Sequence, residues 1–400
     1  MERHCSISRV RFDGQESMRF GRFILGFLCS SLLLTAVQAQ TIGDRNLELV
    51  KHHYEVAQRF EASGDWRAAE KEWRAVLALQ PGDARAWTNL GVVLNRQNET
   101  AGAMEAWKQA IKIAPNLAGP HFNIGLALVR QQKYADAVPF LRRAIELEPN
   151  NDGARRALAL ALIGTEQFRE ATREIARLLR DSPRDPALLE MAAESLMRQR
   201  RYGEATTVLK RRLDLGNQTG ELWAKYGDAL DGDKRTSEAL EAYKRAVDLA
   251  PDSISTRYGF GYLLWKLYRY DEAERELTEV LRRDANEARA AFTLGDLYLT
   301  KGDAKRALSF LEQAATIYPE EFDTRFALGR ALMLTGDTKR GIDELRAAVR
   351  LDEAIADGHF QLGRALMQTG QKEEGKRELD RARDLKEAKR AAERLPERPH

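Results

Sequence analysis

The sequence predicts an all-α protein, a solenoid of ten stacked helix-turn-helix repeats of 34 residues each. The chain resembles itself when it is shifted by 34 residues, which is the mark of a repeat architecture. Ala, Leu, Arg and Glu, all good helix formers, dominate the composition, and no run of alternating β-branched residues predicts a strand. Charged residues reach 31% beside 43% hydrophobic residues, which is typical of long amphipathic helices with solvated outer faces.

One register holds through most of the chain. Residues 84–117 and 118–151 align without a gap, and the same spacing continues in both directions. Because these units occupy residues 50–389, we expect no separate catalytic domain within this sequence. The ten units are residues 50–83, 84–117, 118–151, 152–185, 186–219, 220–253, 254–287, 288–321, 322–355 and 356–389.

Small residues recur where the two helices of one unit would approach each other. The eighth position of every unit is Gly or Ala, and the twentieth is Ala in eight units and Gly in the last two. Large apolar residues would fill the surrounding space, as Leu294, Tyr298 and Leu311 do in one unit. A proline ends six of the units and prevents the second helix from continuing. These prolines are Pro81, Pro115, Pro149, Pro183, Pro251 and Pro319.

The unit at residues 84–117 carries the pattern most completely, with Trp87, Leu90, Gly91, Leu94, Ala103, Trp107, Ala110 and Pro115. In this pattern the unit resembles the tetratricopeptide repeat, and the resemblance covers all ten units. It implies a right-handed α-solenoid whose concave surface is lined by the first helix of each unit. It also implies that positions two, five, six, nine, twelve and thirteen of that helix face the groove, where a protein or peptide partner would bind.

The resemblance points first to two asparagines at the sixth position, Asn89 and Asn123. In some relatives a ladder of such asparagines holds the backbone of an extended peptide, since an amide can both donate and accept hydrogen bonds. The ladder is incomplete in this chain, because the following units carry other residues at that position. We therefore expect Asn89 and Asn123 to contribute to binding without forming a full ladder.

A second set of candidates lies at groove positions of the C-terminal half. It contains aromatic and arginine side chains, which commonly anchor interfaces, with Met333 and Met367 beside them. The phenylalanines could instead pack between neighbouring units, whereas Trp265 occupies a position that normally faces solvent. The candidates are Tyr258, Tyr262, Trp265, Phe292, Phe326, Arg330, Phe360 and Arg364.

The sequence offers no pattern of catalytic or metal-binding residues. It contains neither a P-loop nor an HExxH pattern, and Gly259-Phe260-Gly261 does not follow a strand. His53, His121 and His359 share the fourth position of their units, where tryptophan stands in two others, so we interpret them as half-buried packing residues. We therefore expect a non-enzymatic protein without a catalytic residue, a cofactor or a metal ion.

The first 39 residues have the features of a secretory signal. Arg19 and Arg22 precede an apolar segment, and Val37-Gln38-Ala39 fits a signal-peptidase site. Residues 1–39 would then be removed, with Met18 as an alternative start, leaving a lead-in at 40–49, the repeats at 50–389 and a polar tail at 390–400. Both cysteines lie in the signal, which would leave no disulfide. We expect a periplasmic or secreted protein, or alternatively one anchored by its N-terminus and facing the periplasm.

Charge limits the range of partners. The net charge is +3, of which the signal contributes +2 from five Arg and three acidic residues, leaving +1 for residues 40–400. A long chain so close to neutrality is not expected to bind nucleic acid or to insert into a membrane after signal cleavage. The sequence favours a cell-envelope scaffold or adaptor for a protein or peptide partner. The alternatives are a homo-oligomer docked through its repeat ends, and a recruiting subunit of an envelope-processing enzyme.

Overall fold

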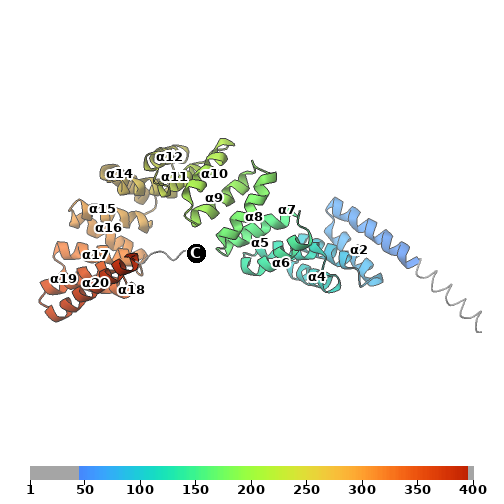
Figure 1. Cartoon of the computed structure of the whole chain (residues 1–400). Helices are drawn as coiled ribbons and strands as arrows, with labels where there is room; N and C mark the ends of the chain where they lie inside the picture. The colour runs from blue at the N-terminus through green and yellow to red at the C-terminus, as the bar shows by residue number, and fades with distance from the viewer. Residues whose placement is uncertain (1–44, 395–400) are drawn as a thin grey trace, which may run out of the picture. The chain divides into compact units, whose positions relative to one another are not determined.

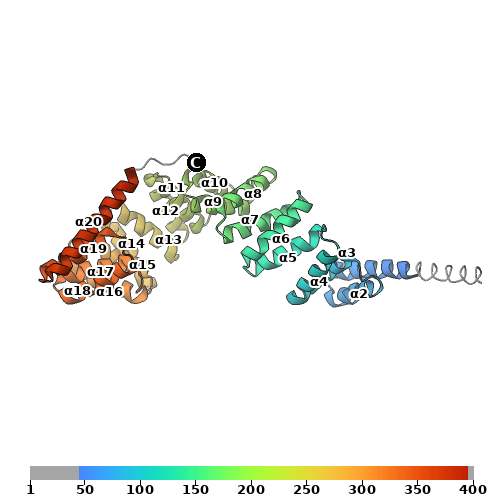
Figure 2. The ribbon, with the colours of Figure 1, turned by 60° about the horizontal axis from the view of Figure 1, so that its bottom comes forward.

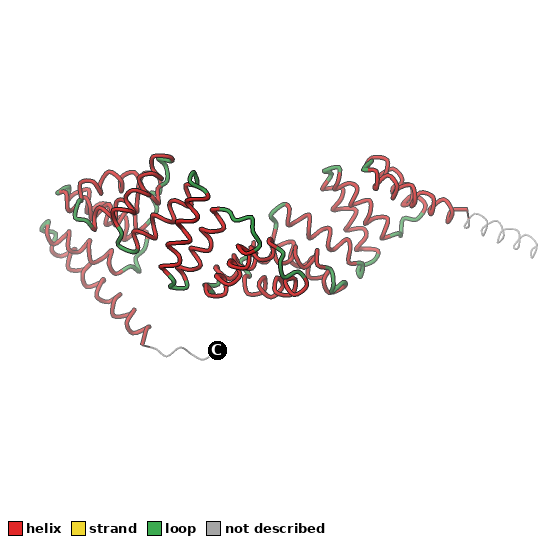
Figure 3. Tube along the Cα trace, turned by 90° about the horizontal axis from the view of Figure 1, so that it is seen from above, coloured by secondary structure: helices red, strands yellow, loops and turns green. Residues whose placement is uncertain are grey.

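The computed structural model describes residues 45–394, and within this range the secondary structure is helical, with no strand (Figures 1 and 3). The predicted all-α repeat fold is therefore confirmed. The chain divides into two compact units, Met1–Leu178 and Leu179–His400. The predicted signal at residues 1–39, including Met18, lies outside the described residues. None of the described helices is long and apolar enough to cross a membrane.

The first unit contains four helix pairs in the predicted register, and the last helix of the fourth pair crosses its boundary. The described part of its first helix covers residues 45–63. Each later first helix begins at the predicted start of a repeat, and α8 carries the boundary between the two units. These helices are α2 (Trp66–Leu79), α3 (Ala84–Arg96), α4 (Thr100–Ile113), α5 (Ala118–Arg130), α6 (Tyr134–Leu147), α7 (Asp152–Gly164) and α8 (Phe168–Asp181).

The second unit continues with six helix pairs. Its odd-numbered helices are the first helices of the repeats, and α11, α13, α15, α17 and α19 contact one another in that order. The helices are α9 (Pro186–Arg198), α10 (Tyr202–Asp214), α11 (Gly220–Gly232), α12 (Thr236–Leu249), α13 (Ile254–Lys266), α14 (Tyr270–Arg283), α15 (Ala288–Thr300), α16 (Ala304–Ile317), α17 (Phe322–Thr335), α18 (Thr338–Leu351), α19 (Ala356–Gln368) and α20 (Lys372–Arg394).

The eighth position of the repeat is the point of closest helix approach. A Cβ atom on Gly295 would lie 2.5 Å from Cγ of Leu311, and one on Gly329 would lie 2.7 Å from Cγ of Leu345. Both leucines belong to the second helix of the same repeat and are buried. A larger residue would force the helices apart, which explains why the sequence keeps glycine or alanine at this position.

The turn inside each repeat has the same backbone conformation in all ten described units. Its central residue, at position fifteen, has φ between 58° and 91°, in the left-handed region. Four of the ten are glycines, which adopt this region without a steric penalty. Of the other six, Asn98 tolerates this region, and it is unfavourable for the remaining five. The glycines are Gly64, Gly302, Gly336 and Gly370, and the others are Asn98, Gln132, Glu166, Arg200, Lys234 and Tyr268.

The last described helix has a solvated outer face. α20 has 23 residues, whereas α18 has 14, and α20 continues past residue 389 into the predicted polar tail (Figure 2). Of its side chains described up to residue 391, only Ala382 is buried, together with Gly375. The remaining side chains include many charged groups in contact with water. α20 therefore presents a polar outer face, of the kind found at the ends of solenoids.

Candidate partner-binding surface

Asn89 and Asn123 lie in equivalent places on α3 and α5, which are neighbouring first helices. Both side chains are half-buried, and neither hydrogen bonds to another residue in the described part of the chain. The ninth position of these two repeats and of the next one carries an apolar row of Val92, Leu126 and Leu160, and Leu160 is 42% exposed. The first unit thus combines free amides with apolar side chains. The apolar residues stand at the ninth position of the repeat, which the family resemblance places in the groove.

Tyr258, Tyr262 and Trp265 form a continuous aromatic surface on α13, here called the α13 stack. The rings of Tyr262 and Trp265 are stacked at 5.4 Å between centroids, and those of Tyr258 and Tyr262 are 6.1 Å apart. Tyr262 is 42% exposed, whereas Tyr258 and Trp265 are half-buried and pack against the core. The three residues predicted from the sequence are thus brought together, with Tyr262 the most accessible.

A cavity of about 420 Å³ opens beside the α13 stack. Gly259 allows the ring of Tyr243 from α12 to approach α13, because a Cβ on Gly259 would lie 2.7 Å from Cε1 of that ring. The Tyr243 hydroxyl donates a hydrogen bond to Asp228 of α11. Arg289 of α15 closes the other side, with its guanidinium 4.6 Å from the centroid of the Tyr258 ring. Helices α11, α12, α13 and α15 all contribute to this cavity.

Two aspartates on the same helices have raised pKa values. Burial is the main cause for both Asp228 and Asp296, since loss of water disfavours a carboxylate. Hydrogen bonds oppose this effect, from Tyr243 to Asp228 and from the Trp265 side chain to Asp296. The positive charge of Arg330 also lowers the pKa of Asp296. Both aspartates were missed in the sequence, although they stand at the ninth position of their repeats, where groove residues were expected.

The three predicted phenylalanines differ in exposure. Phe292 is half-buried against the core formed around α13 and α15. Phe326 is half-buried against the core of the last two repeats and stacks on Phe322 at 5.5 Å. Phe360 is 37% exposed and has two cations near its ring, Arg364 at 5.8 Å and Lys386 at 5.2 Å. Packing between units thus accounts for part of the Phe292 and Phe326 surfaces, whereas Phe360 remains accessible.

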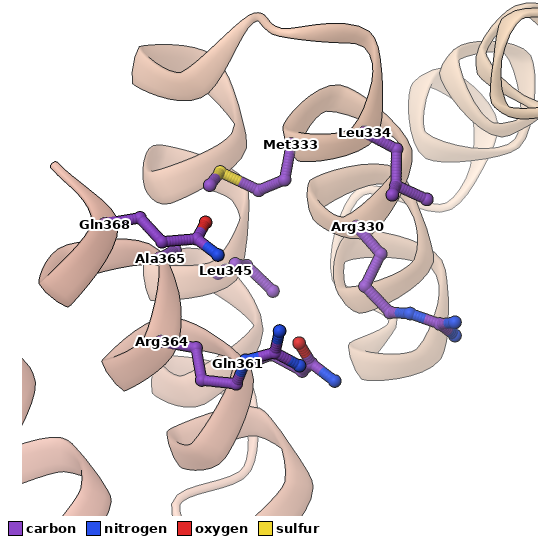
Figure 4. Close-up of a pocket in the computed structure, with 8 residues that line it drawn as sticks. All are labelled: Arg330, Met333, Leu334, Leu345, Gln361, Arg364, Ala365 and Gln368. Carbon is purple, nitrogen blue, oxygen red and sulfur yellow. The ribbon is translucent and has the colours of Figure 1, made fainter.

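Arg330 and Arg364 line a pocket of about 410 Å³ between α17 and α19 (Figure 4). They occupy the ninth position of successive repeats. Arg330 lies over Phe326 at 5.7 Å, as Arg364 does over Phe360. The pocket joins aliphatic and polar side chains from both repeats. Its other lining residues are Met333, Leu334, Leu345, Gln361, Ala365 and Gln368.

The histidines occupy structural positions. Nδ1 of His53 lies 2.5 Å from Glu72, and Nδ1 of His359 lies 2.6 Å from Glu378, in each case nineteen residues later in the chain. His121 contacts the carbonyl of Pro115 at 3.0 Å. Among residues 45–394, no group of three or more His, Cys, Asp or Glu side chains is arranged to hold a metal ion.

The paired helices, their constant 34-residue spacing and the lining of the first-helix face define a helical repeat solenoid of the kind that binds partners along its surface. Two family models, both described as tetratricopeptide repeat, match this chain. One matches residues 54–118, 190–254 and 258–322, and the other matches residues 128–194 and 298–354. The chain belongs to the tetratricopeptide repeat family.

Solved structures with similar folds include MamA 41-end from Desulfovibrio magneticus RS-1, at 21% identity and a TM-score of 0.40, covering 42% of this chain and 96% of that one. YrrB, described as a TPR protein with an unusual peptide-binding site, has 23% identity and a TM-score of 0.31, covering 55% and 96%. The Cut9-Hcn1 hetero-tetramer has 13% identity and a TM-score of 0.48, covering 83% and 86%. No curated protein matches the sequence of this chain.

Proposed function

We propose that this protein is a non-catalytic scaffold or adaptor that binds a peptide or protein segment on the first-helix face of residues 220–368. This face comprises the exposed side chains of α11, α13, α15, α17 and α19. Membership of the tetratricopeptide repeat family supports protein binding in general, and YrrB is an example of a repeat protein with a peptide-binding site.

The α13 stack carries the proposal. Three adjacent aromatic rings, with Tyr262 42% exposed, provide a rigid amphipathic surface beside a cavity of about 420 Å³. Tyrosine and tryptophan are enriched among residues that dominate binding energy, because they cover much area and lose few rotamers. The stack lies on one helix, α13, and Tyr258 and Trp265 pack against the core, so it is held rigidly before a partner arrives.

We also propose that the protein acts outside the cytoplasm, in the cell envelope. The support is the signal-like segment at residues 1–39 and the absence of cysteine from residues 40–400. N-terminal peptide mapping of the protein isolated from its source tests this directly. A chain that begins at Gln40 supports export, whereas a chain that retains residues 18–39 in a membrane fraction supports the anchored alternative.

Cross-linking and capture with the full chain test the binding function. We compare the wild type with a Tyr262→Ala, Trp265→Ala variant, and with Tyr262→Ala alone because Trp265 is partly in the core. Tyr268→Ala, Tyr318→Ala is the matched control, since both tyrosines are exposed outside the first-helix face. A partner retained by the control and weakened about tenfold or more in the stack variants supports the proposal. Equal capture by all variants contradicts it.

A homo-oligomer formed through the repeat ends is the alternative function. The solvated, charged outer face of α20 gives this alternative little apolar surface at the C-terminal end. Sedimentation or light scattering of the purified chain over a wide range of concentration separates the two functions. A monomer at the highest concentration excludes the homo-oligomer. A stable dimer whose formation blocks partner capture would favour the homo-oligomer over the adaptor.

A further inference from the structure

We propose that the pocket between α17 and α19 binds an acidic side chain of the partner, with the carboxylate held by Arg364 and Arg330. This inference rests on the proposed function, because it names the chemistry that one part of the first-helix face recognises. The partner segment would place a Glu or Asp in this pocket, flanked by apolar residues.

The shape of the pocket suits a short segment of chain. Its volume is about 410 Å³, which is within the range of ligand-binding pockets and larger than one side chain requires. Leu345 and Ala365 are buried and form an apolar floor. Figure 4 shows side chains of α17 and α19 on opposite sides of the opening, with Leu345 behind them. Apolar atoms next to a carboxylate would therefore be removed from water here.

The charged groups of the pocket are all of one sign. Its lining holds two guanidinium groups and the amides of Gln361 and Gln368, but no carboxylate. Neither Arg330 nor Arg364 forms an ion pair with any described residue. Their N–H groups are free to bind a carboxylate in the bidentate geometry that arginine favours. Other arginines of these repeats are already paired: Arg325 with Glu344, Arg340 with Glu312, and Arg346 with Glu374, at 2.7, 2.7 and 2.9 Å.

The two arginines are oriented before a ligand binds. Arg330 lies over Phe326, and Arg364 lies over Phe360. Each arginine follows its phenylalanine by four residues on the same helix, and its guanidinium carbon is less than 6 Å from the ring centroid. Cation–π contacts of this kind restrict a flexible side chain while leaving its N–H groups available. Binding then costs less conformational entropy than it would with two unrestrained arginines.

Neighbouring acidic residues favour a single carboxylate over a phosphate-rich ligand. The carboxylate of Asp296 lies close enough to Arg330 and Asp323 for both charges to influence its pKa. On α19, the carboxylate of Asp357 forms an ion pair with Lys386 at 3.1 Å. These acids confine the positive potential to a small area and would repel a polyanion. A monoanionic carboxylate is the group that this arrangement accommodates best.

The surroundings also favour a side-chain carboxylate over a chain terminus. Leu334 on α17 is 66% exposed, and Phe360 and Met367 on α19 are exposed as well. Apolar surface therefore continues from α17 to α19 on either side of the two arginines. A segment that continues past the pocket in both directions would bury this surface, whereas a segment that ended at Arg364 would leave part of it in water.

The direct test uses labelled peptides with blocked ends. Fluorescence anisotropy with the full chain compares acetyl-Leu-Glu-Leu-Glu-Leu-amide with the same peptide carrying Gln in place of Glu. We expect the Glu peptide to bind about tenfold or more tightly, and added salt to reduce this preference. Arg330→Gln, Arg364→Gln should abolish the preference, and Arg364→Glu should shift it towards a Lys peptide. Arg350→Gln, Arg377→Gln, at two exposed arginines outside the pocket, is the matched control and should keep it.

Several outcomes would overturn the proposal. One is equal binding of the Glu and Gln peptides to the wild type, and another is a preference that survives in the double pocket variant. A Gln peptide with a free carboxyl end that binds as tightly as the blocked Glu peptide would assign the pocket to a chain terminus. Displacement of the Glu peptide by inorganic phosphate at concentrations where acetate has no effect would assign it to phosphate.

The two proposals can fail separately. If the captured partner is lost with Tyr262→Ala, Trp265→Ala but retained with Arg330→Gln, Arg364→Gln, then only the carboxylate pocket is wrong. If neither double variant weakens capture, the first-helix face is not the binding surface and the proposed function fails as well.

Discussion

At the scale of single residues, one polar contact recurs through the array. The side chain at the fourth position contacts a glutamate at the twenty-third, nineteen residues later, in five repeats. Three of these pairs also reach the carbonyl of the proline that closes the preceding repeat. The contact ties the two helices of one repeat to the end of the repeat before. The pairs are His53–Glu72, Arg155–Glu174, Arg257–Glu276, Arg325–Glu344 and His359–Glu378.

The pair of Arg155 and Glu174 is the most buried of the arginine pairs, since both side chains are only 11% exposed. Removing one partner leaves the other charge with little water, so Glu174→Ala should lower the free energy of unfolding by about 3 kcal/mol. Urea unfolding measures this change. The control is Glu170→Ala, on the same helix as Glu174, which breaks a more exposed pair with Arg142 of α6 and should cost under about 1 kcal/mol. Equal effects of the two changes would contradict a structural role for the buried pair.

Asp228 gives a pH-dependent prediction. Burial raises its pKa in the folded state, so its contribution to stability is present below the unfolded pKa and is lost as pH rises through the folded pKa. Asp228→Asn keeps an oxygen that accepts from Tyr243 but removes the buried charge. The variant should therefore unfold at a higher temperature than the wild type at pH 7, and the difference should shrink as the pH is lowered. Thermal unfolding at several pH values measures this difference.

Asp248→Asn is the matched control for this experiment, because Asp248 is exposed on α12. Its unfolding temperature should follow that of the wild type at each pH. A lower unfolding temperature for Asp228→Asn at pH 7 would show that the charged hydrogen bond from Tyr243 outweighs the cost of burial.

At the scale of helices and turns, the sequence predicted most of what the structure contains. Each repeat needs glycine or alanine at its eighth position, and most need a proline at their end. These requirements are local, so they can be recognised in the sequence of each repeat independently. The ends of α3 to α19 accordingly follow the 34-residue register. The length of α20 was not predicted beyond residue 389, because no following repeat fixes its end and its residues are all compatible with a helix.

The binding surface was less predictable for a physical reason. Aromatic and arginine candidates could be selected by position, but their exposure depends on neighbouring repeats. Trp265 is half-buried and hydrogen bonded to Asp296 of the next repeat, and Phe360 is exposed with Lys386 of α20 near its ring. The cavity beside Gly259 requires the ring of Tyr243 from another repeat. These contacts are made between residues of different repeats, and the periodicity within a single repeat does not predict them.

The shared turn conformation makes a prediction for Tyr268. This residue has φ of 62° and is 78% exposed, so its side chain gains little from packing. Glycine removes the steric penalty of the left-handed region but makes the unfolded chain more flexible. Tyr268→Gly should therefore raise the free energy of unfolding by about 0.5–1 kcal/mol. Gly302, with φ of 81°, shows glycine at the same turn position of the next repeat. Gly302→Ala should lower the free energy of unfolding, and urea unfolding measures both.

The free energies of unfolding of Tyr268→Gly and Gly302→Ala are interpreted together. A loss of stability in both Tyr268→Gly and Gly302→Ala would mean that the Tyr268 ring contributes through its contact with Tyr270, at 6.0 Å, more than its backbone costs. A gain in Tyr268→Gly with a loss in Gly302→Ala is the expected result.

At the scale of the whole molecule, the first-helix positions differ in chemistry between the two units. In the first unit the ninth position is Gln58, Val92, Leu126 and Leu160, three of them apolar and beside free asparagine amides. In the second unit the same position carries Glu194, Asp228, Tyr262, Asp296, Arg330 and Arg364, in chain order. Carboxylates therefore precede guanidinium groups along the second unit, which would fix the direction of a bound segment that carries opposite charges.

The repeat architecture also predicts that damage to one repeat stays local. Each repeat contacts mainly its neighbours, so stability is close to a sum of repeat and interface contributions. Gly295→Leu should overpack the helix pair α15 and α16, since a Cβ there would already lie 2.5 Å from Leu311, and should cost about 1–3 kcal/mol. Gly82→Leu is the control, because no atom lies within 4 Å of the position of its Cβ.

Hydrogen exchange resolved by peptide measures how far the effect of Gly295→Leu extends. Faster exchange should appear in α14 to α17 and should leave α3 to α6 unchanged, because opening of one repeat removes the contacts of the adjacent repeats first. Faster exchange along the whole chain would show that the protein unfolds as one cooperative body. Unchanged stability in Gly295→Leu would contradict the register itself, since the eighth position would then not lie at the closest approach of two helices.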